Sequence, residues 1–332
     1  MKLAVILVAA AAWAQSWVGQ RSGTIASLRG ISVVNARLAW ASGAGGTWLT
    51  TSDGGDTWRS GTVRGGEKLD FRAVHAVDER TAWLMSVGSG AESRVYHTSD
   101  GGIHWRQQLT APGPKGFFDA MAFWDARRGL VLGDPVGGEF EIYTTDDGGR
   151  HWRRQHTPPA LPEEGAFAAS NSALVLRGNR EAWFGTGGPG GARVFHSIDG
   201  GGSWTVVRTP IRDDGAPAGI FSLAFAGGTL GVAVGGDYSK PTEAVRNIAV
   251  SADGGRSWTA PARAPAGFRS AVLYLAGYKA WIATGTSGSD LSLDAGESWQ
   301  TFDTESYNAL GAADGLVLAV GPKGRIAALR MK

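Results

Sequence analysis

The sequence predicts an all-β protein built as a seven-bladed β-propeller, and three observations support this fold class. A polar turn of the form Ser/Thr-x-Asp-x-Gly-x-x-Trp occurs six times, with its aspartates at Asp53, Asp100, Asp147, Asp199, Asp253 and Asp294. Successive aspartates lie 41 to 54 residues apart, a repeat length that suits one four-stranded blade. The 332 residues include 51 glycines and 14 tryptophans, which is typical of short strands joined by tight turns.

Each part of the repeated turn has a physical role, as the copy from Thr51 to Trp58 illustrates. A hairpin turn leaves backbone N–H groups unpaired, and a carboxylate at its start accepts hydrogen bonds from them. Glycine supplies the positive φ that the turn needs. The tryptophan opens the outgoing strand, where we expect its ring to fill the gap to the neighbouring blade. The pattern resembles the Asp-box repeat of bacterial neuraminidases, which is an element of folding and by itself says almost nothing about catalysis.

The chain begins with a segment typical of a secretory signal peptide. Lys2 precedes an apolar run from Leu3 to Trp13, and Ala14 completes a small-residue cleavage site. The run is shorter than the ~20 residues that span a bilayer, and no later stretch is a candidate for a transmembrane segment. We therefore expect residues 1–14 to be removed. Residues 15–332 are predicted to form a single propeller domain that is periplasmic or secreted.

The blades can be counted from their second strands, which number one more than the boxes. Each is marked by an Ala-Trp or a Gly-aliphatic pair, at Ala39-Trp40, Ala82-Trp83, Gly129-Leu130, Ala182-Trp183, Gly231-Val232, Ala280-Trp281 and Gly315-Leu316. The six box-bearing blades are predicted at residues 24–63, 70–110, 117–158, 166–210, 219–262 and 267–303. The C-terminal segment from Tyr307 to Arg330 supplies only three strands of a seventh blade.

The missing fourth strand is predicted at the other end of the chain. Ser16-Trp17-Val18-Gly19 resembles the end of a box, comparable with Thr57-Trp58-Arg59-Ser60. Pairing this segment with residues 324–329 closes the ring and leaves no unpaired radial edge where the chain ends meet.

Composition excludes several classes of function. The chain has no cysteine, so disulfides and thiolate chemistry are absent. The formal charge of +2 includes Lys2, which leaves 31 − 30 = +1 for the chain without its first 14 residues and no field for nucleic acid. The glycine-rich loops join strands and open no helix, so no nicotinamide or flavin cofactor is predicted. We expect a monomer.

Propeller connectivity separates two faces. The boxes join third to fourth strands on one side, the box face. The loops that enter first strands, and those that join second to third strands, lie on the other side, the loop face, where ligands are expected. Candidate ligand-binding residues on the loop face are Arg72, Asp119, Asp134, Glu164, Arg193, Asp237, Tyr238 and Arg269. Arg29 lies near the start of another first strand. This mixture suits an anionic or sugar ligand, and it also suits a hydrated rim without a ligand.

A sialidase-like glycoside hydrolase is the enzymatic alternative. It needs three converging arginines, a tyrosine with a neighbouring glutamate, and an acid/base aspartate. The Phe/Tyr-Arg-Ile-Pro motif that opens that family is missing, and Phe71-Arg72-Ala73-Val74 is a poor substitute. No residue is assigned a catalytic role. The six histidines form no metal-ligand pair and no box has the Asp-x-Asp-x-Asp-Gly order of a calcium loop, so no metal is predicted.

A closer resemblance covers nearly the whole chain after the signal. Residues 38–43, followed by residues 47–55, are similar to the photosystem II stability and assembly factor family. Residues 133–135, 166–171 and 235–238 resemble its relatives in non-photosynthetic bacteria. The resemblance implies an exported, non-enzymatic propeller that assists assembly by binding protein through an arginine-rich surface. We therefore expect a scaffold whose loop face binds a protein partner or a glycan, with an exo-acting glycosidase as the alternative.

Overall fold

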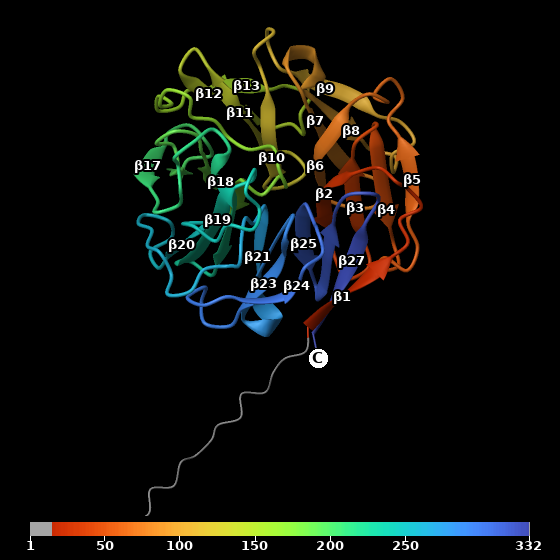
Figure 1. Cartoon of the computed structure of the whole chain (residues 1–332). Helices are drawn as coiled ribbons and strands as arrows, with labels where there is room; N and C mark the ends of the chain where they lie inside the picture. Colours follow the sequence, from red (N-terminus) through yellow and green to blue (C-terminus); the bar gives the residue numbers. More distant parts are fainter. Residues whose placement is uncertain (1–14, 332) are drawn as a thin grey trace, which may run out of the picture.

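The computed structural model describes residues 15–331, which form a ring of seven antiparallel sheets (Figure 1). The predicted fold class is confirmed. Blades 1 to 3 are β2 (Leu28–Val33), β3 (Ala39–Gly43), β4 (Thr47–Thr51) and β5 (Arg59–Thr62); β6 (Asp70–Ala76), β7 (Ala82–Val87), β8 (Arg94–Thr98) and β9 (Arg106–Thr110); β10 (Phe118–Phe123), β11 (Gly129–Val136), β12 (Glu139–Thr145) and β13 (Arg153–Gln155).

Blades 4 to 6 are β14 (Leu174–Arg177), β15 (Glu181–Gly185), β16 (Arg193–Ser197) and β17 (Thr205–Arg208); β18 (Ala218–Ala226), β19 (Leu230–Asp237) and β20 (Ile248–Ser251); β21 (Ala271–Leu275), β22 (Ala280–Gly285), β23 (Gly288–Ser292) and β24 (Gln300–Asp303). Blade 7 is β25 (Ala309–Ala313), β26 (Leu316–Val320), β27 (Ile326–Met331) and β1 (Gln15–Gln20). Two short 3-10 helices are η1 (Gly90–Glu92) and η2 (Ala276–Tyr278). No helix within residues 15–331 is long and apolar enough to cross a membrane. The predicted signal peptide lies outside the described residues.

The ring is closed by the two ends of the described chain, as predicted. Strand β1 pairs antiparallel with β27, with Trp17 opposite Leu329 and Gln20 opposite Ile326. The Trp17 ring packs against Tyr307 at a centroid distance of 5.3 Å, and its indole N–H donates a hydrogen bond to Ser289 Oγ of blade 6 at 3.0 Å. Trp17 therefore joins blade 7 to blade 6 as well as completing its own sheet.

The hydrophobic core is a ring of layers between neighbouring blades. In one layer, Trp83 of blade 2 packs with Phe118 and Val131 of blade 3. The box tryptophan of blade 3, Trp152, lies at the edge of that same layer. Large rings suit this position because the sheets face each other about 10 Å apart and the gap must be filled.

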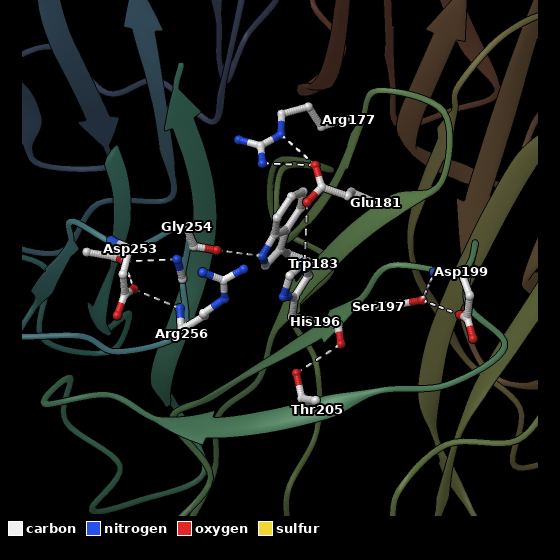
Figure 2. A network of polar contacts seen from close by, with 12 residues as sticks. Arg177, Glu181, Trp183, His196, Ser197, Asp199, Thr205, Asp253, Gly254 and Arg256 are labelled. Atoms are coloured by element: carbon white, nitrogen blue, oxygen red, sulfur yellow. Dashed lines mark hydrogen bonds and ion pairs between the residues drawn. The ribbon is translucent and has the colours of Figure 1, made fainter. Parts of the chain in front are cut away.

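The box turns are held by short-range hydrogen bonds and also connect blades. In blade 5, Asp253 Oδ1 accepts a hydrogen bond from the backbone N–H of Arg256 at 2.9 Å (Figure 2). It accepts another from the backbone N–H of Ser257, also at 2.9 Å. The carbonyl of the next residue, Gly254, accepts a hydrogen bond from the indole N–H of Trp183 in blade 4 at 3.2 Å (Figure 2). Three other boxes make the same kind of contact: a side chain of the preceding blade donates a hydrogen bond to the carbonyl of the glycine that follows the box aspartate. These glycines are Gly54, Gly101 and Gly148. A box therefore stabilises its own turn and the contact with its neighbour.

Two blades depart from the expected pattern. In blade 5 the fourth strand is reduced to a bridge between Val250 and Thr259, because Pro261 and Pro265 lack the N–H groups that would continue a ladder. In blade 4 the first strand begins only at Leu174 and not near residue 166. Residues 166–171 instead run across the ring axis, and they form part of the site described next.

Candidate functional site

Four first strands carry a β-bulge at the same level, near their loop-face ends. Leu28 pairs with Gly43 and Gly30 with Ser42, so Arg29 is the extra residue of the bulge. The strand pairing shifts in the same way at Arg72, Asp119 and Phe221, each of which is the extra residue of a bulge. A bulge re-aims the side chain of its extra residue. These four side chains all line one pocket.

The pocket has a volume of about 520 Å³, which is in the usual range for small-molecule and peptide-side-chain sites. Its lining comes from all seven blades, so it lies on the ring axis, and we call it the axial pocket. The lining residues are Arg29, Arg72, Phe117, Asp119, Asp134, Ala166, Phe167, Ala168, Ala169, Phe221, Tyr238, Phe268, Ser270, Thr286 and Asn308.

The segment of residues 166–171 bounds the axial pocket because polar contacts hold it across the axis. The backbone N–H of Ala166 donates to Asp134 Oδ1 of blade 3 at 3.0 Å, and the carbonyl of Ala168 accepts a bond from Arg72 Nη1 of blade 2 at 2.9 Å. On the far side, Ser170 Oγ donates to the carbonyl of Ser270 in blade 6 at 2.6 Å. Blade 4 therefore has a short first strand, and the segment before that strand forms one boundary of the axial pocket.

One half of the axial pocket is charged, and its charges are only partly matched. Arg72 Nε donates to Asp70 Oδ2 at 2.8 Å. Burial, and then the nearby Arg72 cation, lower the pKa of Arg29 to about 10, and its Nε has no hydrogen-bond partner among residues 15–331. Unpaired buried donors are uncommon in folded proteins and mark places where a water or a ligand belongs.

The two carboxyl groups of blade 3 share this half of the axial pocket. Asp119 is 1% exposed, and its Oδ2 has no partner among the described residues. Burial, reinforced by the negative charge of Asp134, raises the pKa of Asp119 well above its usual value. Burial also raises the pKa of Asp134, although the hydrogen bond from Ala166 opposes the shift.

The other half of the axial pocket is aromatic. Phe167 and Phe221 stack with ring centroids 3.8 Å apart and planes 11° from parallel. Phe268 meets Phe221 edge to face at 4.7 Å, and Tyr238 lies 6.1 Å from Phe221. Tyr238 is 55% exposed and forms the outer edge of this wall. The arrangement offers apolar side chains a packing surface beside unpaired polar atoms.

Four predicted ligand residues, Arg72, Asp119, Asp134 and Tyr238, lie in the axial pocket, but the other four do not. Glu164 and Arg193 form a buried ion pair, with Arg193 Nε donating to Glu164 Oε1 at 2.8 Å. Arg269 is fully buried and pairs with Asp290.

Asp237 is also buried, and its Oδ1 accepts hydrogen bonds from the backbone N–H and hydroxyl of Ser239 at 2.9 and 2.6 Å. Asp237, Glu164, Arg193 and Arg269 thus stabilise loops, and their charges are matched within the fold.

From the sequence, Arg29 was expected near the start of a first strand but was not among the candidate ligand-binding residues. The phenylalanines that line the pocket were not predicted either. A signal was available. The first strands share a large residue, a variable residue and a small residue, as in Leu28-Arg29-Gly30, Phe71-Arg72-Ala73, Phe118-Asp119-Ala120 and Ile220-Phe221-Ser222. Aligning these triplets would have selected all four bulged residues. The aromatic partners from loops have no comparable pattern.

The fold and the axial pocket define the class of protein, a seven-bladed β-propeller with a pocket on its axis. No family model matches the chain, and no curated protein matches it. Solved structures, in contrast, do match the chain. A YCF48 bound to D1 peptide has a TM-score of 0.67 and 17% identity, with 94% of this chain and 96% of that chain covered.

YCF48 from Cyanidioschyzon merolae has a TM-score of 0.61 and 17% identity over 94% of this chain and 98% of that one. A virginiamycin B lyase from Staphylococcus aureus has a TM-score of 0.69 and 12% identity over 96% and 100%. Likenesses at these identities show the fold. They confirm the propeller implied by the resemblance to photosystem II assembly factors.

Proposed function

We propose that this protein is an exported scaffold that binds a segment of a partner protein in the axial pocket, in the manner of an assembly or stability factor. The observation that carries the proposal is the pocket itself, where an aromatic wall faces unpaired polar groups. A peptide segment carries both kinds of group, because its side chains offer apolar surface and its backbone offers C=O and N–H groups. The structural likeness to a YCF48 bound to D1 peptide supports a peptide as the ligand.

The export and the monomeric state are part of the same proposal. Export rests on the apolar segment from Leu3 to Trp13 and the cleavage site at Ala14. A monomer is expected because β1 pairs with β27, so the seventh blade leaves no unfinished sheet for a second copy to complete.

Site-specific photo-crosslinking tests the proposal. A p-benzoylphenylalanine replacing Tyr238 is expected to capture a defined segment of one partner in the native host, identified by mass spectrometry of the crosslinked peptide. The matched control replaces Ile103, which is 72% exposed and belongs to a box, on the opposite face. Equal capture from both positions, or none from position 238, would contradict binding at the axial pocket.

A sialidase-like glycoside hydrolase remains the second candidate because of one observation. Asp119 and Asp134 line the same pocket, and both have a raised pKa, as a general acid requires. The test is hydrolysis of a panel of aryl glycosides and sialosides by the wild type and by Asp134→Asn. Turnover that is lost in Asp134→Asn would favour the enzyme over the scaffold.

A further inference from the structure

Neither carboxyl group of the axial pocket forms an ion pair with a residue in the range 15–331, although Arg72 is near enough to Asp119 to oppose the rise of its pKa. Within residues 15–331, the backbone N–H of Ala166 donates to Asp134 Oδ1, whereas no group donates a hydrogen bond to the buried Asp119 Oδ2. A carboxylate as buried as that of Asp119 is normally paired with a cation or with several donors, since an unpaired buried charge is costly. The pair is therefore an incomplete site.

The arginines of the same pocket do not complete it. Arg72 is engaged by Asp70 and by the carbonyl of Ala168. Arg29 keeps an unpaired Nε–H, a donor that suits a carbonyl oxygen. The lining of the axial pocket holds two arginines and two aspartates, Asp119 and Asp134, and Asp70 beside the pocket already pairs with Arg72. With both blade 3 carboxyls ionised, the group therefore carries one unmatched negative charge. One additional positive charge, placed beside blade 3, balances it.

Resting on the proposed function, we infer that the axial pocket recognises a lysine side chain of the partner segment, next to an apolar residue. The ammonium contacts the partly exposed Asp134 carboxylate and lies in the field of Asp119. The neighbouring apolar side chain and the lysine stem pack on Phe167, Phe221 and Tyr238. A slender ammonium on a flexible stem suits a narrow polar recess beside an aromatic wall.

Protonation of Asp119 gives the inference a second readout. Its pKa is raised in the free protein, firstly by burial and secondly by Asp134, with Arg72 opposing the shift; Arg29 and Asp70 are the other charged groups nearby. An arriving ammonium favours the ionised carboxylate. Binding of lysine is therefore coupled to release of a proton, and its affinity rises with pH through the pKa of Asp119.

The test uses the full chain and three blocked peptides, acetyl-Gly-Lys-Phe-Gly-amide and its norleucine and glutamate counterparts, with affinities measured by calorimetry. We expect the lysine peptide to bind about tenfold more tightly than the norleucine peptide, a typical gain for a charge-assisted contact. Asp134→Asn is expected to abolish that preference. Asp119→Asn is expected to reduce both that preference and the increase of the preference with pH, because only the raised pKa of Asp134 then remains.

The matched control is Asp56→Asn, on an exposed box residue of the opposite face, which is expected to leave all three affinities unchanged. Equal binding of the lysine and norleucine peptides, or tighter binding of the glutamate peptide, would overturn the lysine inference and leave peptide binding standing. Failure of all three peptides to bind, in protein shown to be folded by circular dichroism, would count against the proposed function as well.

Discussion

The indole N–H of Trp183 donates a hydrogen bond to the carbonyl oxygen of Gly254, 71 residues further along the chain and in the box of the next blade. Trp83 makes the equivalent contact with Gly148. Trp281 has no such partner among the described residues. Blade 7 has no box to offer, because β27 ends and β1 begins where its box would lie. Substituting Trp183 and Trp281 in turn therefore separates the contribution of the hydrogen bond to stability from the contribution of ring packing.

Trp183→Phe is expected to lower the free energy of unfolding by about 1–3 kcal/mol more than Trp281→Phe does, the cost of leaving a buried carbonyl unpaired. Both rings are fully buried, so the loss of packing is similar in the two variants. Urea unfolding of the two proteins measures the difference. Equal destabilisation would mean that the hydrogen bond between blades contributes nothing to stability.

The box aspartates are expected to make the protein sensitive to acid. The backbone N–H of His104, followed by its side chain, lowers the pKa of Asp100 to about 2, compared with about 3.9 in an unfolded chain. A group whose folded pKa is depressed contributes stability above the unfolded pKa and loses it as the pH falls through the folded pKa. The contribution of Asp100 therefore disappears between about pH 4 and about pH 2.

Asp100→Asn should consequently melt at a lower temperature than the wild type at pH 7, and the two melting temperatures should converge near pH 2. Asp56→Asn, in the box of blade 1, is the control, because its carboxylate holds no turn amide among the described residues. Peptide binding on the loop face should be unaffected by Asp100→Asn. A difference in melting that is unchanged at low pH would contradict the role given to the carboxylate.

Closure of the ring is expected to depend on Trp17. Trp17→Ala should cost about 3 kcal/mol, near the low end for a tryptophan, because the ring is partly exposed. The control Val18→Ala, on a side chain that is 46% exposed, should change stability by less than about 0.5 kcal/mol. Chemical denaturation measures both changes.

Deletion of residues 15–23 should have a larger effect, because it opens the edge of β27 to other chains and promotes aggregation. Light scattering during thermal unfolding detects this outcome. A truncated protein that remains monomeric and as stable as the parent would argue against closure as a source of stability.

Asp119→Asn is expected to increase stability at alkaline pH. Because the folded pKa of Asp119 is raised, the folded state binds more protons than the unfolded state between the two pKa values, and stability falls as the pH rises through that interval. The amide of asparagine has no charge to desolvate, so the variant should lose less stability from pH 5 to pH 8. Urea unfolding at both pH values checks this, and a wild type with a flatter profile than the variant would contradict it.

Local chemistry made much of the fold predictable. The bonds of a box join Asp253 to the backbone of residues three and four positions ahead, so a short motif is sufficient to specify the turn. Six such motifs at blade spacing, together with the strand-like segment around Trp17, were enough to predict seven blades and the pairing of β1 with β27. The shortened fourth strand of blade 5 was not predicted, although Pro261 and Pro265 pointed to it.

The sequence by itself therefore determined the repeat, the number of blades, the closing strand and the face on which Arg72, Asp119, Asp134 and Tyr238 lie. Only the tertiary structure decided which loop-face charges remain unpaired. Glu164 and Arg193 neutralise each other, whereas Asp119 has an Oδ2 atom without a hydrogen-bond partner among the described residues. The reason is that a bulge and an ion pair depend on the register of a neighbouring strand and on loops from distant blades. The axial pocket exists because residues from all seven blades, from Arg29 to Asn308 in the sequence, converge on one axis.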